Sequence, residues 1–522
     1  MKVRTPLLDG VFDARLVERP SSVARGEHEV VLEIDAGAPI QVSPPDGSGC
    51  VVVEASDAEW DALRTAGFEL ARDEPTPRSS SGLLARFGAA LNRASVRFVP
   101  DPFVLALILT LLVLGFGLAL APLDTVLVGW VEGFASPGGL AFALQMCLVL
   151  VTGHALATSP PVQRLVSRLA ELRWGAAGSA ALVAFVACVA AVVHWGLGAI
   201  MGAFLAREIA RNAQTRGVRL HYPLLGGAAY AGLAVWHGGL SGSAPLKVAE
   251  EGHFAADHVG VIPVEATLFA PLNLIVTSTL CVLIPLAFYL MTPPEAARVG
   301  PSNLPPSTDD ETRVVEGASR LGELAPIGRV VGLLGLGGIL AGWIMGELRL
   351  DLNLVNLMFL FAGILAQAKL RRYVDAVADG ARGAGAIVLQ FPFYFGILGV
   401  MQVSGMIESI SHAMVRVASP ETFPVLAFGS AGLVNLCVPS GGGQWAVQGE
   451  ILLEAAHQLG VDPATVVMAF SYGDAWTNML QPFWALPLLG IMGLEAKDII
   501  GYTGVVCVLM GVVVPVLLLV LG

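Results

Sequence analysis

Val438-Pro439-Ser440-Gly441-Gly442-Gly443-Gln444-Trp445 interrupts a long apolar region near the C-terminus. It separates residues 423–437 from residues 446–456, and neither segment alone reaches the roughly 20 residues that cross a bilayer. Pro439 cannot donate a helical hydrogen bond and three glycines weaken a helix, so the backbone is predicted to open here. Open backbone at membrane depth is tolerated where protein covers it or where it lines a cavity. We expect a re-entrant hairpin of the kind that binds ions and anions in carriers; a loop outside the membrane between two short helices is the alternative.

Composition indicates a polytopic helical membrane protein. The chain has 522 residues, of which 55% are hydrophobic and 14% charged, and the mean hydropathy is +0.70. Its six cysteines show no paired spacing, so neither a disulfide framework nor a metal site is predicted. The net charge is −12, and residues 1–80, with 8 Lys and Arg against 15 Asp and Glu, carry −7 of it. This acidity argues against nucleic acid as a partner.

Residues 1–80 differ in character from the remainder. Residues 28–35 and 49–54 have strand patterns, and Ser56-Asp57 precedes a predicted short helix over 58–65. Residues 75–82 have the composition of a linker. We expect a small, soluble α+β domain and linker at the N-terminus.

The remaining chain divides into two apolar halves, residues 81–291 and 327–522, joined by a polar, proline-rich linker at 292–326. We predict an all-α polytopic membrane protein. The expected spans are 103–121, 139–157, 178–211, 223–250 and 262–290 in the first half, and 327–346, 353–370, 384–401, 423–457, 464–488 and 498–521 in the second. Of these, 178–211, 223–250, 423–457 and 464–488 are interrupted.

Loop charge predicts the orientation, because loops rich in Lys and Arg stay in the cytoplasm. The N-terminus and the loops that carry Arg164, Arg216, Arg313 and Arg371 are expected to be cytoplasmic. The loop 122–138 has no Lys or Arg and is expected to face outward. This assignment of the loops is self-consistent only if 178–211 is a hairpin that enters the membrane from the cytoplasm and returns to it.

The two halves show an internal repeat. Gln145 precedes Gly196 by 51 residues, and Gln390 precedes Gly441 by the same 51. In each copy an apolar span is followed by an amphipathic helix, over 155–170 and 402–417, and only the first is rich in arginine. By this charge difference the copies lie on opposite membrane faces, so we expect two inverted repeats with re-entrant hairpins and broken helices.

The repeat pairs four interrupted segments: 193–198, 235–243, 438–445 and 472–479. If they meet near the bilayer midplane, helix N-termini offer N–H groups to a carboxylate, while carbonyl, Ser and Asn oxygens suit a small hard cation. The candidate substrate-binding residues are His194, Trp195, Gly196, Gly198, Trp236, His237, Ser241, Ser243, Ser440, Gly441, Gly442, Gly443, Gln444, Trp476, Thr477 and Asn478. The candidate ion-coupling residues are His194, Ser440, Asp474 and Asn478.

Each candidate has a purely structural alternative. Ser241 and Ser243 can bond back to their own helices, and His194 and His237 can be satisfied interior histidines. Asp474 is a functional candidate because an intramembrane charge is costly, but it can also cap a helix. The tryptophans can serve packing as well as the wall of a site.

These residues resemble the AtoE-type short-chain fatty acid transporter family, within the ion transporter superfamily of inverted-repeat carriers. The similarity covers roughly 95–522. Its densest motifs are Val438-Pro-Ser-Gly-Gly-Gly-Gln444 and Gln481-Pro-Phe-Trp-Ala-Leu-Pro487, and Gln390-Phe-Pro-Phe-Tyr394 contributes as well. The family usually has asparagine at the position of His194 and glycine at that of His237, and residues 1–80 lie outside its pattern.

The resemblance implies a secondary transporter of short-chain carboxylates such as acetoacetate or butyrate in the bacterial cytoplasmic (inner) membrane. It also implies coupling to a cation gradient, and a scaffold and a transport domain that move as an elevator, often in a homodimer. No cofactor is expected beyond Na⁺ or H⁺ as coupling ion, and the two histidines could move that coupling from sodium toward protons.

Other classes remain open at this stage. A carrier of another anion, such as a dicarboxylate, is disfavoured by the lack of arginine at either hairpin tip. A membrane sensor that signals through residues 1–80 is a further alternative. An enzyme is not expected, because no HExxH, GxSxG or P-loop pattern occurs.

Overall fold

The computed structural model describes residues 102–293 and 321–522, apart from 383, 437 and 482, together with strand residues 2–4, 30–33, 39–43, 50–53 and 69–70. The chain forms two units, residues 1–82 and 83–522. Each unit is described by itself.

The N-terminal unit contains a five-stranded antiparallel sheet in the order β2-β3-β4-β1-β5. Strands β2 (Val30–Glu33) and β4 (Cys50–Val53) lie within the two stretches expected to be strands. The others are β1 (Lys2–Arg4), β3 (Pro39–Ser43) and β5 (Glu69–Leu70). The expected helix over 58–65 lies outside the described residues, so an α+β domain stays a prediction.

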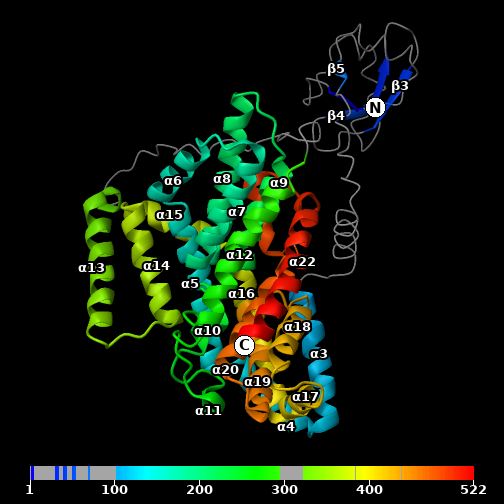
Figure 1. The fold of residues 1–522 in the computed structure, drawn as a ribbon, viewed down its shortest axis with the longest axis vertical. Coiled ribbons are helices and arrows are strands. Elements are labelled where there is room, and N and C mark those ends of the chain that lie inside the picture. The colour runs from blue at the N-terminus through cyan, green and yellow to red at the C-terminus, as the bar shows by residue number, and fades with distance from the viewer. Residues whose placement is uncertain are drawn as a thin grey trace. The chain divides into compact units, whose positions relative to one another are not determined.

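The second unit is helical, as the hydropathy predicts (Figure 1). Its first half contains α3 (Pro102–Leu120), α4 (Leu123–Phe134), α5 (Pro137–Ala157), α6 (Pro160–Ala170), α7 (Gly175–Val193), α8 (Trp195–Thr215), α9 (Tyr222–Tyr230), η1 (Ala231–Ala234), η2 (Trp236–Gly238), α10 (Ser243–Lys247), α11 (Ala256–Val259) and α12 (Pro271–Leu290). Its second half contains α13 (Ala325–Ile344), α14 (Leu352–Gln367), α15 (Leu370–Ala381), α16 (Gly385–Val403), α17 (Met406–Val415), α18 (Phe423–Asn435), α19 (Gly441–Leu459), α20 (Pro463–Asn478), η5 (Phe483–Ala485), α21 (Leu486–Met492) and α22 (Ala496–Leu521).

Five helical stretches of the described chain are long and apolar enough to cross a membrane. A sixth qualifies if the bent pair α16–α17, which turns by 79°, is taken as one span. The prediction of a polytopic helical membrane protein is therefore confirmed. Most of the expected linker lies outside the described residues, so its cytoplasmic location stays a prediction.

One expected loop is a helix. Residues 122–138 were predicted to form an outward-facing loop, but residues 123–134 form α4, which begins after Pro122. Gly129 and Gly133 of α4 lie directly against the backbone of α16, where an added Cβ would meet Gly399 O at 3.1 Å and clash with Phe395 O. Only one side of α4 is packed in this way, because Leu123, Val128 and Val131 on the helix are more than half exposed.

One expected helix break lies elsewhere. Residues 472–479 were predicted to unwind, but α20 runs without interruption to Asn478, and the chain leaves the helix at Met479 and Leu480. Gly473 is helical, and a Cβ there would clash with Phe428 O of α18. This glycine therefore permits close helix packing and does not open the backbone.

The interruptions in the other three segments are confirmed. Helix α7 ends at Val193 and α8 begins at Trp195, with only His194 between them. Helix α18 ends at Asn435 and α19 begins at Gly441. After α9 the chain continues as two short 3₁₀ turns and an extended Gly239 before α10.

Two helix pairs, α7–α8 and α18–α19, approach the centre of the unit from opposite ends (Figure 1). Helices α6 and α17, which follow α5 and α16, also lie at opposite ends. The inverted repeat itself stays a prediction. Helices α13 and α14 stand side by side at one edge, and α14 packs on α5.

Candidate functional site

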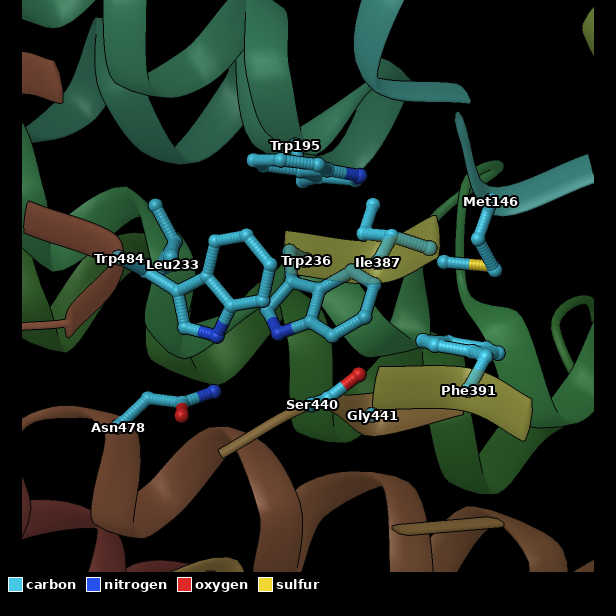
Figure 2. Close-up of a pocket in the computed structure, with 10 residues that line it drawn as sticks. All are labelled: Met146, Trp195, Leu233, Trp236, Ile387, Phe391, Ser440, Gly441, Asn478 and Trp484. Atoms are coloured by element: carbon cyan, nitrogen blue, oxygen red, sulfur yellow. The ribbon is translucent and has the colours of Figure 1, made fainter. Parts of the chain in front are cut away.

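A narrow cavity lies where the two helix pairs and two further broken segments meet (Figure 2). Its volume is about 30 Å³, on the scale of two ordered waters. The lining residues are Met146, Trp195, Leu233, Trp236, Ile387, Phe391, Ser440, Gly441, Asn478 and Trp484. None of these ten residues is charged. The wall is apolar and aromatic, and its polar groups are few.

The first helix break is built around His194, which has extended backbone and is fully buried. Its Nδ1 accepts a hydrogen bond from Gly196 N at 3.1 Å and so caps α8. The imidazole occupies space left by Gly153 of α5, where an added Cβ would clash with His194 Cε1. His194 Nε2 has no hydrogen-bond partner among the described residues. His194 is therefore a capping residue that packs against α5.

The second break is built around Ser440, the N-cap of α19. Its Oγ accepts from Gly443 N at 3.3 Å, and its carbonyl accepts the first helical bond of α19 from Gln444 N at 2.7 Å. The N–H groups of Gly441 and Gly442 come before that bond in the chain, so they have no carbonyl acceptor within the helix, as at the start of any helix. Figure 2 shows Ser440 and Gly441, at the start of α19, among the residues around the cavity.

The glycines that follow Ser440 are helical, which corrects the expectation that they form an open turn. An added Cβ on Gly441 would lie 2.9 Å from both His237 Cε1 and the Trp236 ring, and one on Gly443 would lie 2.5 Å from the Tyr394 ring. Gly442 is less crowded, with Phe142 at 3.2 Å. These positions lack side chains because aromatic rings pack directly on the first turn of α19.

The interrupted segment between α9 and α10 lies between the break at His194 and the break at Ser440. Ser241 Oγ accepts from Trp195 N, the first N–H of α8, at 3.0 Å. Ser243 Oγ lies 3.1 Å from His237 Nε2. Ser241 bonds to α8 and Ser243 bonds to His237. These bonds differ from the structural alternative, in which each serine bonds back to its own helix. Both are fully buried.

His237 and Asp474 form a buried pair. His237 Nδ1 lies 2.9 Å from Asp474 Oδ2, and both side chains are fully buried. His237 Nε2 accepts from Ala244 N at 3.2 Å, so the imidazole proton lies on Nδ1 and is donated to the carboxylate. Asp474 Oδ1 has no hydrogen-bond donor among the described residues. Asp474 is not a helix cap, because it lies inside α20.

The end of α20 is held by a network of amide groups. Asn435 Nδ2 of α18 donates to Asp474 O, Thr477 Oγ1 and Asn478 Oδ1 at 2.9, 2.9 and 3.0 Å. Gln481 Nε2 donates to Asn478 Oδ1 at 3.1 Å, and Tyr230 OH donates to Asn478 O at 2.9 Å. These bonds occupy the oxygens of Asn478 and leave its Nδ2 directed toward the cavity (Figure 2).

Three indole rings form much of the wall. The Trp195 ring lies edge-on to Trp484 and Trp236, with centroids 5.3 and 6.4 Å apart. Trp484 Nε1 donates to Pro439 O at 2.7 Å, which ties η5 to the second break. The indole N–H groups of Trp195 and Trp236 are buried and have no acceptor among the described residues. The wall therefore contains two N–H donors without partners.

Several predicted site residues do not line the cavity. Trp476 packs on Phe428 with centroids 4.8 Å apart and donates to Cys507 O at 2.7 Å. Thr477 donates to Gly432 O at 2.9 Å, and Gln444 donates to Ala431 O at 2.7 Å. The other predicted residues also lie outside the lining: Gly196 and Gly198 in α8, Gly442 and Gly443 in α19, and His194, His237, Ser241 and Ser243 at the helix breaks.

Sequence reasoning placed Trp195, Trp236, Ser440, Gly441 and Asn478 correctly at one cavity. It did not identify five other lining residues: Met146, Leu233, Ile387, Phe391 and Trp484. Phe391 and Trp484 belong to the motifs 390–394 and 481–487, so their presence in those motifs was a usable signal. The three aliphatic residues carry no such signal.

The donors suit an anion better than a metal. Across the described residues no group of three or more His, Cys, Asp or Glu side chains lies close enough to hold a metal ion. The first residues of α8 and α19, Trp195 and Gly441, both line the cavity. The first two N–H groups of α8 are held by Ser241 Oγ and His194 Nδ1, so the start of α19 is the helix end that offers N–H groups to an anion. The Ser440 hydroxyl and the Asn478 amide add further polar groups, whereas the indole nitrogens of Trp195 and Trp236 are buried. A small carboxylate with an apolar tail matches this arrangement.

The fold is that of a polytopic helical membrane protein with an uncharged cavity at its centre. The profile of the family described as "Short chain fatty acid transporter" matches residues 83–521. A relative from Escherichia coli (strain K12), named for short-chain fatty acid transport, is 38% identical over 427 residues, which is 80% of this chain and 96% of the relative. One from Haemophilus influenzae (strain ATCC 51907 / DSM 11121 / KW20 / Rd), named in the same way, is 34% identical over 435 residues, with the same coverage of 80% and 96%.

The chain therefore belongs to the short-chain fatty acid transporter family, whose members are transporters and not enzymes. The crystal structure of the YdaH transporter of Alcanivorax borkumensis has a similar fold, with a TM-score of 0.53 and 16% identity over 81% of this chain and 98% of that chain. Residues 1–82 lie outside the family profile.

Proposed function

We propose that this protein is a secondary active transporter of short-chain fatty acids or related small monocarboxylates, such as acetoacetate and butyrate, in the bacterial cytoplasmic membrane. The observation that carries the proposal is that the first residues of α8 and α19, Trp195 and Gly441, line one uncharged cavity with Ser440 and Asn478. A carboxylate there receives N–H and O–H donors, and the indole, Phe391 and Met146 side chains receive its tail.

The absence of charge from the wall favours a monocarboxylate over a dicarboxylate. All ten lining residues are neutral. A second carboxylate would need its own cationic or multiple N–H partners once it left water, because an unpaired buried charge is costly. The volume of about 30 Å³ holds little more than a carboxylate group. A tail of a few carbons therefore requires wall side chains to move, and a longer tail requires larger movements.

The remainder of the proposal concerns mechanism. Transport is driven by a cation gradient, Na⁺ or H⁺, and proceeds by elevator-type alternating access in a homodimer, with the N-terminus in the cytoplasm. The opposite approach of α7–α8 and α18–α19 supports inverted repeats around a central site (Figure 1). Helices α6 and α15, which carry Arg164 and Arg371, lie at the same end, which supports the orientation.

The test is exchange of labelled butyrate in liposomes that contain the purified full-length protein. Vesicles are loaded with unlabelled butyrate and diluted into trace label, and protein-free liposomes measure leakage of the neutral acid. We expect label to accumulate transiently, and acetate, propionate and acetoacetate to compete while succinate does not. Competition by succinate alone would replace the monocarboxylate proposal with a dicarboxylate carrier, and no exchange of either would contradict transport of carboxylates.

Two variants locate the exchange. Ser440→Ala removes a hydroxyl donor and a helix cap, and Asn478→Ala removes the amide directed to the cavity, so we expect both to abolish butyrate exchange. Ser409→Ala on α17 is the control, because Ser409 is exposed and bonds only to Gly405 O of its own turn. All three must elute as intact protein. Normal exchange by both site variants would exclude this cavity as the binding site.

A further inference from the structure

The buried pair of His237 and Asp474 lies directly behind the proposed carboxylate site, and its role goes beyond substrate binding. The Trp236 ring of the cavity wall stacks on the His237 ring, with centroids 4.3 Å apart. An added Cβ on Gly441 would lie 2.9 Å from His237 Cε1. The His237 ring therefore contacts both the cavity wall and the start of α19. On its other side the imidazole contacts Asp474.

The hydrogen bonds indicate which ring nitrogen of His237 carries the proton. Ala244 N–H donates to His237 Nε2, so this nitrogen carries a lone pair, and the single imidazole proton lies between Nδ1 and Asp474 Oδ2. With this tautomer the pair carries one net negative charge when Asp474 is ionised and none when Asp474 Oδ1 carries a proton. Asp474 Oδ1 receives no hydrogen bond from any described residue. This oxygen is the open position at which one more proton can bind.

No cation near the pair neutralises this charge among the described residues. Lys247 on α10 is the nearest cationic side chain along the chain, and it is engaged with Glu250 at 2.6 Å. Tyr230 on α9 donates its OH to Asn478 O and Gln481 O at 2.9 and 3.1 Å and supplies no positive charge.

The other elements packed around the pair contribute few titratable groups. Tyr472 lies on the same helix as Asp474, and its OH donates to Asn273 of α12. On α19, Glu450 accepts from Gln402 of α16 at 2.7 Å, and Glu454 and His457 lie further toward the end of the helix. Cys188 on α7, Cys281 on α12 and Cys507 on α22 complete the titratable groups in the interior stretches of these neighbours, and none is a cation. An ionised Asp474 is thus a buried negative charge without a positive partner, which is costly in a membrane interior.

We infer that the His237–Asp474 pair is the proton-binding site that couples carboxylate transport to a proton gradient. This inference rests on the proposed function. With the pair deprotonated, its negative charge opposes a second negative charge at the start of α19. When a proton from water forms an O–H bond at Asp474 Oδ1, the net charge of the pair becomes zero and the carboxylate can bind. The proton and the carboxylate cross together, and both are released on the other side.

The added proton has a second atom to which it can bind, His237 Nε2. If it moves to His237 Nε2, that nitrogen donates to Ser243 Oγ, 3.1 Å away, and Ala244 N–H loses its acceptor. Ser243 and Ala244 form the start of α10. Protonation of the pair is therefore linked to the geometry of the interrupted segment, whose Ser241 holds the first N–H of α8. Through this segment the proton affects both helix breaks.

A proton is favoured over Na⁺ as the ion bound here. Sodium requires several oxygen ligands around one point. At Asp474 the only side-chain oxygen without a donor is Oδ1. Beside it the Trp236 ring stacks on His237 and the Phe470 ring lies edge-on to His237. The pair itself is fully buried. One proton needs only the lone pair that Oδ1 offers.

The first experiment measures protons directly. Purified full-length protein in weakly buffered, sodium-free solution at pH 7 is mixed with choline butyrate and a pH-indicator dye, and bound butyrate is measured in parallel. We expect uptake of about one proton per bound butyrate. Asp474→Asn is expected to bind butyrate without proton uptake and with an affinity that no longer varies between pH 6 and pH 8. Asp462→Asn is the matched control, because Asp462 is an exposed cap of the same helix and asparagine caps equally well.

The outcomes separate the two proposals. Butyrate binding without proton uptake, binding that requires Na⁺, or unchanged uptake by Asp474→Asn would each overturn the proton site and leave the transport proposal standing. If wild-type protein binds no butyrate, the proposed function fails, and infrared difference spectra between pH 5 and pH 9 then test the site alone. A protonated carboxyl band that Asp474→Asn removes supports the site, and a spectrum that the variant does not change overturns it.

Discussion

Ser241 Oγ accepts a hydrogen bond of 3.0 Å from Trp195 N, so a residue of the interrupted segment after α9 holds the first N–H of α8. Trp195 lines the cavity and Ser241 stands behind it. The position of one wall residue therefore depends on a helix break 46 residues further along the chain. The break before α8 and the interrupted segment after α9 therefore form one structural unit.

Ser241→Ala tests this connection. The variant leaves Trp195 N–H buried without an acceptor, and such a group costs about 1–3 kcal/mol. We expect the thermal midpoint of the detergent-solubilised protein to fall and butyrate affinity to weaken, because Trp195 loses its anchor. Ser409→Ala, which removes an exposed hydroxyl, should leave both unchanged. Equal behaviour of the two variants would mean that the bond does not position Trp195.

Lys247, the last residue of α10, forms a buried ion pair with Glu250, with side chains 9% exposed and Nζ 2.6 Å from Oε2. Gln145 Nε2 also donates to Glu250, at 2.9 Å. Lys247→Met leaves the carboxylate without its cation, which costs about 3–5 kcal/mol when a buried pair is broken. We expect a large fall in the thermal midpoint, and recovery of most of it in the double variant Lys247→Met/Glu250→Gln. A double variant no more stable than the single one would show that the charge is not the cause.

His221 predicts a pH dependence of stability. Its Nδ1 caps α9 by accepting from Leu224 N at 3.3 Å, and burial lowers its pKa to about 4 from an ordinary 6.5. The unfolded chain therefore binds more protons than the folded protein between these values, so stability is full above pH 6.5 and declines as the pH falls through this window.

The variant His221→Asn isolates this contribution, because asparagine also caps helices but does not titrate. We expect the thermal midpoint of the wild type to fall more steeply than that of the variant between pH 7.5 and pH 5. Parallel pH profiles would contradict the assignment. The comparison cancels other groups, such as His253, that titrate in both proteins.

The sequence predicted the breaks that proline and glycine produce within apolar segments. Pro439 and the glycines after it indicated the break before α19, and Gly238 and Gly239 indicated the one before α10. The same reasoning failed at Gly473, because a glycine that admits a neighbouring backbone looks identical in sequence to one that unwinds a helix. Only the position of Phe428 O on α18 distinguishes the two.

The composition of the cavity could be predicted only in part. Ser440, Gly441 and Asn478 carry recognisable chemistry at helix ends, and Trp195 and Trp236 lie beside breaks. Trp476 was predicted by the same rule but packs on Phe428, since its direction depends on which face of α20 meets α18. Leu233, Met146 and Ile387 are ordinary apolar residues, and their contact with the cavity results from packing between elements far apart in the chain.

The most direct test of the central claim is equilibrium binding of labelled butyrate to purified Gly441→Ala and Gly429→Ala. A methyl group at 441 would lie 2.9 Å from the Trp236 ring and His237 Cε1, whereas at 429 no atom lies within 4 Å. We predict that Gly441→Ala lowers butyrate affinity at least tenfold, about 1.4 kcal/mol, while Gly429→Ala binds like the wild type. Wild-type affinity in Gly441→Ala would contradict a carboxylate site at the start of α19.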